Sequence, residues 1–187
     1  MHALVALLFV FGQPFWEAKP PEKWSDREIS SMLQNSPWAQ AAPPAPAVLV
    51  YFATARPIEE AESELRLRSK EPLPQPDPEY LTYVSDHRAE QFVLAVPYPT
   101  LRGLGKADEQ KRLEDETVMV IHHKTWHIVG EFPPTPSDPV LRLIFPREVK
   151  PTDKNVVFDL YLGGLDFPER EVEFSVKDLF YHGKFEM

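Results

Sequence analysis

NVVFDLYLGGLDFPEREVEFSV, residues 155–176, is the stretch of the chain that says most about its fold. Residues 155–162 are rich in apolar β-branched and aromatic side chains, which indicates a strand. A Gly-Gly pair follows and supplies a turn. In residues 170–176 apolar and charged side chains alternate, which is typical of an antiparallel strand with one face in the core and the other in water.

Similar patterns along the rest of the chain predict an α+β fold. Further strands are expected at residues 48–53, 91–96, 117–121, 126–132, 140–145 and 181–187. Helices are expected at residues 56–68 and 78–88. Residues 107–116 are expected to form either a weak helix or a charged loop that protrudes from the domain. Strands dominate the second half of the chain and helices the first. We therefore expect a mostly antiparallel sheet with two or three helices packed on one face.

A strong helix signal precedes this domain in the sequence WSDREI, which begins at Trp24. Ser25 and Glu28 have the spacing of a capping box, and the flanking Trp24 and Ile29 have the spacing of a hydrophobic staple. The helix is expected to end before Pro37, because the residue before a proline disfavours the helical conformation.

Residues 40–47, QAAPPAPA, predict a semi-rigid polyproline spacer between this short helix and the main domain. The expected organisation therefore has three parts. Residues 1–14 form a signal segment, residues 15–47 form the capped helix and its linker, and residues 48–187 form a single α+β domain.

The first part of the chain is read as a signal because residues 3–12, ALVALLFVFG, are apolar without interruption. This run is too short for a stable transmembrane helix, which needs about 20 apolar residues, but it fits the apolar region of a secretory signal. We expect export to the periplasm or the medium. The alternative is a buried N-terminal strand or helix, since no Lys or Arg precedes the run and the cleavage site is unclear.

Composition excludes several classes of function. The chain has 20 basic and 29 acidic residues and a net charge of −9, which argues against a nucleic-acid-binding surface. It has no cysteine, so disulfides, a cysteine nucleophile and Cys-ligated metal sites are ruled out. Phosphate-loop, nucleophile-elbow and zinc-protease motifs are also missing, and no cofactor is expected.

The best enzyme-like feature is HHKTWH, which begins at His122. If Lys124 and Thr125 form the turn of a hairpin, His122 faces His127 across the two strands, close enough to share a metal ion. Zinc takes three or four ligands, and the sequence places no third one. The two histidines are therefore metal-ligand candidates for a metal-assisted hydrolase, and the alternative is that both are simply exposed on the hairpin.

Aromatic residues suggest binding functions. Trp24 and Trp38 are candidate contacts for a partner protein, since tryptophan is a common interface anchor, although docking within the chain is the simpler explanation. Tyrosines that could line a groove for a glycan or small ligand, or pack in the core, are Tyr80, Tyr83, Tyr98, Tyr161 and Tyr181. We expect an exported, non-enzymatic domain that binds an envelope or extracellular protein, with a small-ligand or glycan-binding protein as the alternative.

Four short blocks of this chain resemble a group of uncharacterised exported bacterial proteins. The blocks are W-S-x-x-E-I from Trp24, S-P-W-A from Ser36, F-P-R from Phe145 and F-x-x-K-D-x-x-Y-x-G-K from Phe174. The resemblance implies an exported bacterial protein. Because the group has no assigned activity, the resemblance implies no catalytic residue, cofactor or ligand.

Overall fold

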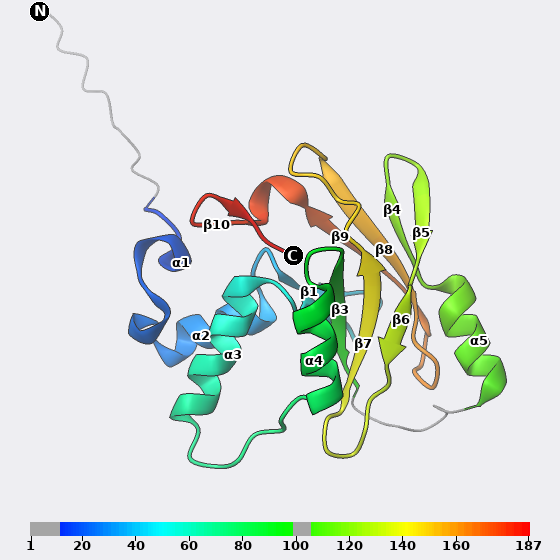
Figure 1. Cartoon of the computed structure of the whole chain (residues 1–187), viewed down its shortest axis with the longest axis horizontal. Helices are drawn as coiled ribbons and strands as arrows, with labels where there is room; N and C mark the ends of the chain where they lie inside the picture. Colours follow the sequence, from blue (N-terminus) through cyan, green and yellow to red (C-terminus); the bar gives the residue numbers. More distant parts are fainter. Residues whose placement is uncertain (1–11, 99–105) are drawn as a thin grey trace, which may run out of the picture.

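The computed structural model describes residues 12–98 and 106–187, and within them it has an α+β fold built on two antiparallel sheets (Figure 1). The five-stranded sheet has the order β1 (Ala39–Ala42), β2 (Val48–Phe52), β3 (Gln91–Pro97), β7 (Val140–Pro146) and β6 (Gly130–Phe132). The four-stranded sheet has the order β5 (Lys124–His127), β4 (Val118–Ile121), β8 (Asn155–Tyr161) and β9 (Glu169–Ser175). The α+β class and the antiparallel pairing are confirmed. The expectation of one sheet is corrected to two main sheets and a separate two-stranded hairpin near the end of the chain.

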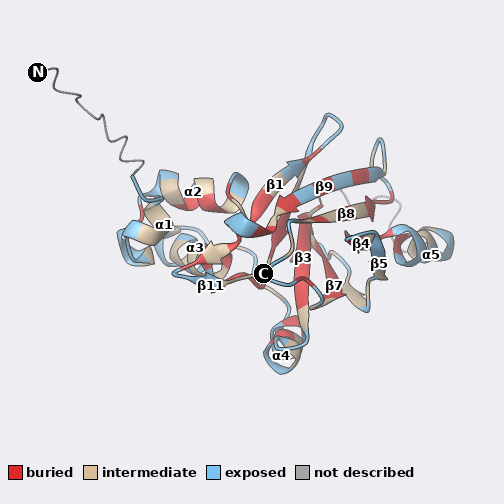
Figure 2. Cartoon of the chain, turned by 90° about the horizontal axis from the view of Figure 1, so that it is seen from above, coloured by how far each residue is buried: buried red, intermediate tan, exposed pale blue. Residues whose placement is uncertain are grey.

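The two sheets are held together by phenylalanines on their facing sides. Phe52 of β2 lies 4.5 Å from Phe174 of β9 and 5.9 Å from Phe158 of β8, measured between ring centroids. Phe145 of β7 lies 5.2 Å from Phe158. Side chains alternate between the two faces of a strand, so each strand contributes every second residue to this core. Figure 2 shows the buried residues concentrated along these strands.

The helix α4 (Pro78–His87) covers part of the other face of the five-stranded sheet, and α5 (Ala107–Glu116) packs against β8 of the four-stranded sheet. The helix α4 packs Tyr80 and Val84 against Val93 and Ile144, which form a second, smaller cluster. The helix α3 (Arg56–Arg68) precedes α4 in the chain, and α2 (Asp26–Gln34) packs against α3 (Figure 1). The structure has five α-helices in its described residues, more than expected, because α1 (Phe15–Ala18) was not predicted and α5 is a regular helix.

The predicted cap of α2 is confirmed in atomic detail. The Glu28 amide donates to the Ser25 hydroxyl at 3.2 Å, and the Ser25 amide donates to the Glu28 carboxylate at 2.8 Å. Hydrogen bonds from the Lys19 ammonium and from Ser25 lower the pKa of Glu28 to about 2. The helix ends at Gln34, before Pro37 as the sequence indicates.

The proline-rich spacer differs from its prediction. Residues 39–42 form strand β1, in which Ala39 pairs with Tyr51 and Ala42 pairs with Val48. The prolines begin only at Pro43, so the preceding backbone amides are free to join a sheet. Trp24, Met32 and Trp38 belong to the same core cluster as residues of the main domain. Residues 24–42 are therefore an integral part of the core, and only residues 43–47 connect β1 to β2.

The chain ends in a small hairpin. A 3₁₀ turn (Val176–Asp178) leads into β10 (Phe180–Tyr181) and β11 (Lys184–Phe185), where a single last strand was expected. Gly183 occupies the turn with a positive φ of 75°, which a glycine adopts without steric cost.

Among the described residues, no helix combines the length and the apolar character that crossing a membrane requires. The predicted signal segment, residues 1–14, lies mostly outside the described residues.

Candidate functional site

The histidine hairpin forms with a different turn from the one expected. The register pairs Val118 with His127 and Ile121 with Lys124. His122 and His123 therefore make the two-residue turn, and both have positive φ, at 47° and 67°. Two-residue hairpin turns of this kind need positive φ at both positions, which histidine tolerates better than the β-branched threonine of Lys-Thr. The predicted register is wrong, and His122 does not face His127.

His122 has another partner. Its Nε2 lies 2.9 Å from Oδ1 of Asp153. Burial opposes ionisation of Asp153, but hydrogen bonds from the Lys150 amide and from His122 outweigh it and lower the pKa of this carboxyl. Within residues 12–98 and 106–187, no three His, Cys, Asp or Glu side chains are grouped so as to hold a metal ion. The structure thus does not bring the two candidate metal ligands together.

The two candidate partner contacts are buried. Trp24 is 2% exposed and Trp38 is 0% exposed. The Trp24 indole donates to the carbonyl of Lys19, and the Trp38 indole donates to the carbonyl of Glu186, near the other end of the chain. A partner contact needs accessible surface, which neither side chain has here. Their positions match the alternative, docking within the chain.

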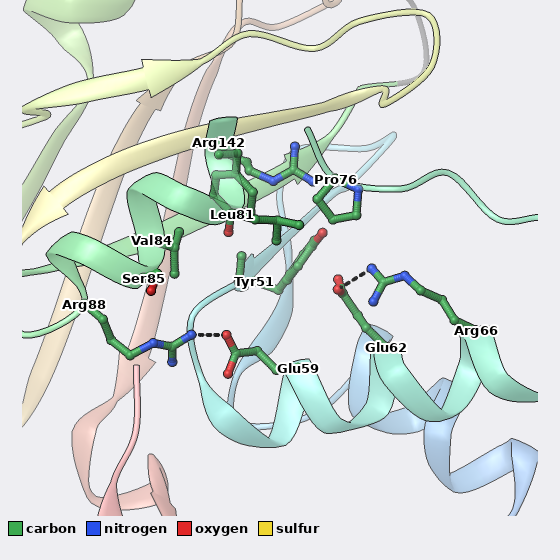
Figure 3. A pocket seen from close by; sticks show the side chains of 12 residues that line it. Tyr51, Glu59, Glu62, Arg66, Pro76, Leu81, Val84, Ser85, Arg88 and Arg142 are labelled. Atoms are coloured by element: carbon green, nitrogen blue, oxygen red, sulfur yellow. Dashed lines mark hydrogen bonds and ion pairs between the residues drawn. The ribbon is translucent and has the colours of Figure 1, made fainter. Parts of the chain in front are cut away.

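A candidate site is the cavity between α3, α4 and the outer face of the five-stranded sheet (Figure 3). Its volume is about 360 Å³, within the range of small-molecule sites. The sheet supplies Tyr51 and Arg142, and α4 supplies Tyr80, Leu81 and Val84. Further lining residues are Ala53, Glu59, Glu62, Arg66, Pro76, Ser85 and Arg88. A smaller cavity of about 280 Å³ shares some of these residues and extends the site toward apolar side chains of α2 and α3.

Every guanidinium that lines the larger cavity is paired with a carboxylate. Arg66 donates to Glu62 at 2.8 Å, and Arg88 bonds Glu59 across the gap between α4 and α3 (Figure 3). Burial raises the pKa of Glu59, and the bond from Arg88 only partly offsets this. These two ion pairs form the polar rim of the cavity. On this rim, hydrogen-bond donors and acceptors lie side by side and the charges cancel.

Arg142 forms a buried, doubly hydrogen-bonded part of the wall. Its two terminal nitrogens donate to the two carboxylate oxygens of Asp138, at 2.7 and 3.2 Å, and both side chains are less than one-tenth exposed. The guanidinium carbon lies 4.4 Å from the centre of the Tyr80 ring, a favourable cation–π distance. Burial raises the pKa of Tyr80 to about 12 despite this cation.

Tyr51 is the aromatic residue at the centre of the cavity. It projects from β2, and Figure 3 shows its hydroxyl between the Glu62 carboxylate and the Pro76 ring. Burial, reinforced by the negative charge of Glu62, raises the pKa of Tyr51, so the phenol keeps its proton at neutral pH. It can therefore donate a hydrogen bond to a ligand, while its ring supplies a flat apolar surface.

The sequence predictions missed most of this site. Tyr80 was among the candidate groove residues, but Tyr51 stands inside a run that reads only as a buried strand. The available signal was Arg142, a charged residue in the otherwise apolar run VLRLIF. A charge in a buried strand needs a partner, and its partner, Asp138, lies four residues earlier.

Comparison with known proteins does not assign this chain to a family. The chain matches no protein-family model, no curated protein and no solved structure. The resemblance of its tryptophan-containing blocks to exported bacterial proteins thus stays a prediction, and the site must be interpreted from its own geometry.

Proposed function

We propose that this protein is an exported, non-enzymatic binding domain that holds a small, neutral, hydroxyl-rich ligand of the glycan class. The ligand occupies the cavity between α3, α4 and the five-stranded sheet. The observation that carries the proposal is the combination of a buried tyrosine, Tyr51, with a rim of guanidinium–carboxylate pairs.

The charge balance of the rim argues for a neutral ligand. An anion approaching Arg66 or Arg88 meets the carboxylate that each already bonds, and a cation approaching Glu59 or Glu62 meets a guanidinium. A sugar avoids both conflicts, since each hydroxyl is both donor and acceptor. Adjacent hydroxyls can therefore bridge the two members of one ion pair without breaking it.

The apolar surfaces of the cavity fit the same class. Leu81, Val84 and Pro76 line it together with the Tyr51 ring. A sugar ring has apolar C–H faces as well as polar edges, so it can place one face on these side chains and its hydroxyls on the rim. Small-molecule sites usually have mostly apolar walls and a few polar groups that fix the orientation of the ligand.

A panel of neutral disaccharides, screened by thermal shift and then by calorimetry, tests the proposal. We expect at least one disaccharide to stabilise the protein, by the amount that mass action gives for its affinity. Tyr51→Phe removes one hydrogen bond, of about 1 kcal/mol, and is expected to weaken that binding about fivefold.

Tyr83→Phe is the matched control. Tyr83 lies on α4, its hydroxyl donates to Gln91 at 2.6 Å, and it does not line the cavity. Loss of a hydroxyl there is expected to leave disaccharide affinity unchanged. If no disaccharide binds at high excess, or if both variants weaken binding equally, the glycan site is not where we propose.

Export is supported by the apolar run at residues 3–12. Fractionation of cells that produce the C-terminally tagged chain checks it. We expect the tagged protein in the periplasm or the medium, at a mass reduced by the leader. Full-mass protein confined to the cytoplasm would remove export from the proposal and leave the ligand site standing.

A further inference from the structure

A second site is indicated by Arg170, at the start of β9. This side chain points to the inner face of the four-stranded sheet, as the buried Val172 and Phe174 do, and the residue is only 3% exposed. One terminal nitrogen donates to the carbonyl of Pro44, and the other donates to the carbonyl of Asp166 at 3.0 Å. Its Nε is buried and has no hydrogen-bond partner.

Arg170 forms no ion pair among the described residues, although Glu169 and Glu171 flank it in β9 and line another cavity with it. Within residues 12–98 and 106–187, no carboxylate forms an ion pair with it, whereas Arg66, Arg88 and Arg142 each have one. The remaining stretches of the chain, residues 1–11 and 99–105, contain no Asp or Glu at all. Burying an unpaired charge is costly, so buried charges in proteins are normally paired. A ligand with a carboxylate group would supply the pairing that no side chain of the described residues gives Arg170.

Arg170 lines a cavity that opens at one end of the two packed sheets. The cavity has a volume of about 470 Å³ and lies where β2 begins, β3 ends, β7 begins and the β8–β9 loop turns back. Its other walls are largely apolar and include Val48, Leu49, Pro97 and Leu165. The carboxylate of Asp166 is on the rim, where the residue is exposed to solvent.

We propose that this cavity binds an aliphatic carboxylate, with the carboxylate on Arg170 and the chain along Val48, Leu49 and Leu165. A planar carboxylate matches the planar fork of N–H donors in a guanidinium. Each terminal nitrogen of Arg170 carries two N–H groups, and the two carbonyls account for one on each. The inference does not depend on the glycan site, whose main cavity has no lining residue in common with this one, although Leu49 and Pro97 also line the smaller cavity beside it.

The test compares decanoate, decanol and acetate as probes of the purified protein by calorimetry. We expect decanoate to bind at least about tenfold more tightly than decanol, because only the carboxylate pairs with the buried charge. Acetate, which has the charge without the chain, is expected to bind more weakly than both. Equal affinity for decanoate and decanol would overturn the proposal, as would no binding of decanoate.

Substitutions locate the effect. Arg170→Met keeps an apolar side chain of similar length and is expected to reduce decanoate affinity more than about tenfold, to that of decanol. Arg56→Met, which removes an exposed guanidinium that lines neither cavity, is the matched control and is expected to leave decanoate affinity unchanged. Unchanged decanoate binding to folded Arg170→Met would also overturn the proposal.

A measurement on the unaltered protein covers the case in which Arg170→Met does not fold. Decanoate is titrated into isotope-labelled protein, and the amide signals that shift are recorded. We expect the largest shifts at Val48, Leu165 and Arg170. Largest shifts at Tyr51 and Tyr80 would place the carboxylate in the other cavity and refute the assignment to Arg170.

Discussion

Replacing Trp38 with alanine is expected to lower the free energy of unfolding by about 3–5 kcal/mol, the usual cost of truncating a buried aromatic side chain. Trp38 is completely buried, and its indole N–H donates to the Glu186 carbonyl at 2.9 Å. Its ring packs edge-on against Trp16 and Tyr181, at 5.9 and 6.2 Å between centroids. The substitution therefore opens a cavity and leaves a buried carbonyl without its donor.

Urea denaturation followed by circular dichroism measures this loss. Trp126→Ala is the control, because Trp126 is only half-buried on the edge strand β5, and we expect it to cost about 1 kcal/mol, a typical value for a single substitution. Trp38→Phe keeps most of the ring and is expected to lie between the two. A different result would contradict this expectation: Trp38→Ala leaves the free energy of unfolding unchanged and abolishes association with a second protein. In that case Trp38 contacts a partner and does not stabilise the core.

The expected loss shows how the N-terminal segment is connected to the rest. Trp38 lies between α2 and β1, but its hydrogen bond and one of its aromatic contacts reach the C-terminal hairpin. The Trp38 side chain thus links the N-terminal segment to the C-terminal hairpin, although the two are far apart in the sequence. This is why a description of residues 15–47 as a separate segment does not match the packing.

Local patterns predicted the elements well. The strands expected at residues 155–162 and 170–176 appear as β8 and β9, displaced by one residue at most. The capping box of α2 appears with both of its hydrogen bonds. These features depend on neighbouring residues only, through side-chain alternation or through a cap that reaches three positions. A single sequence contains all of that information.

Pairing between distant segments was not predictable in the same way. Strand β1 is too short and too rich in alanine to have a strand signature, and it forms because β2 offers an edge. The division into two sheets depends on β6, which follows β5 closely in the chain but pairs with β7. Strand β6 was expected to continue the histidine hairpin. Only packing of the phenylalanine core decides between these arrangements.

The cavities follow from the same long-range packing. Their walls come from segments that are separated in the chain, such as β2, α4 and β7 around Tyr51. Charged residues in strands were nevertheless a readable signal. Arg142 and Arg170 both stand at inward or covered positions of strands, and each lines one of the two proposed sites.

Arg142→Met is the second substitution with a large expected effect, a loss of about 3 kcal/mol in the free energy of unfolding. The side chain of Asp138 is 9% exposed and accepts two hydrogen bonds from Arg142. Without the guanidinium, this carboxylate is left buried and unpaired. Removal of one member of a buried ion pair is strongly destabilising, whereas removal of both is often nearly neutral.

A double-mutant cycle separates the pair from other effects of the substitution. Arg142→Met, Asp138→Asn and the double variant are unfolded in urea at neutral pH, and we expect a coupling energy of about 2–3 kcal/mol, at the upper end for residues in contact. The exposed pair between Lys111 and Asp115 is the control, and Lys111→Met is expected to change stability little. A coupling near zero would mean that water reaches Asp138 when Arg142 is removed. In that case the Asp138 carboxylate is solvated once the guanidinium is gone, and Arg142 contributes to the cavity wall through its contact with the Tyr80 ring rather than through the ion pair.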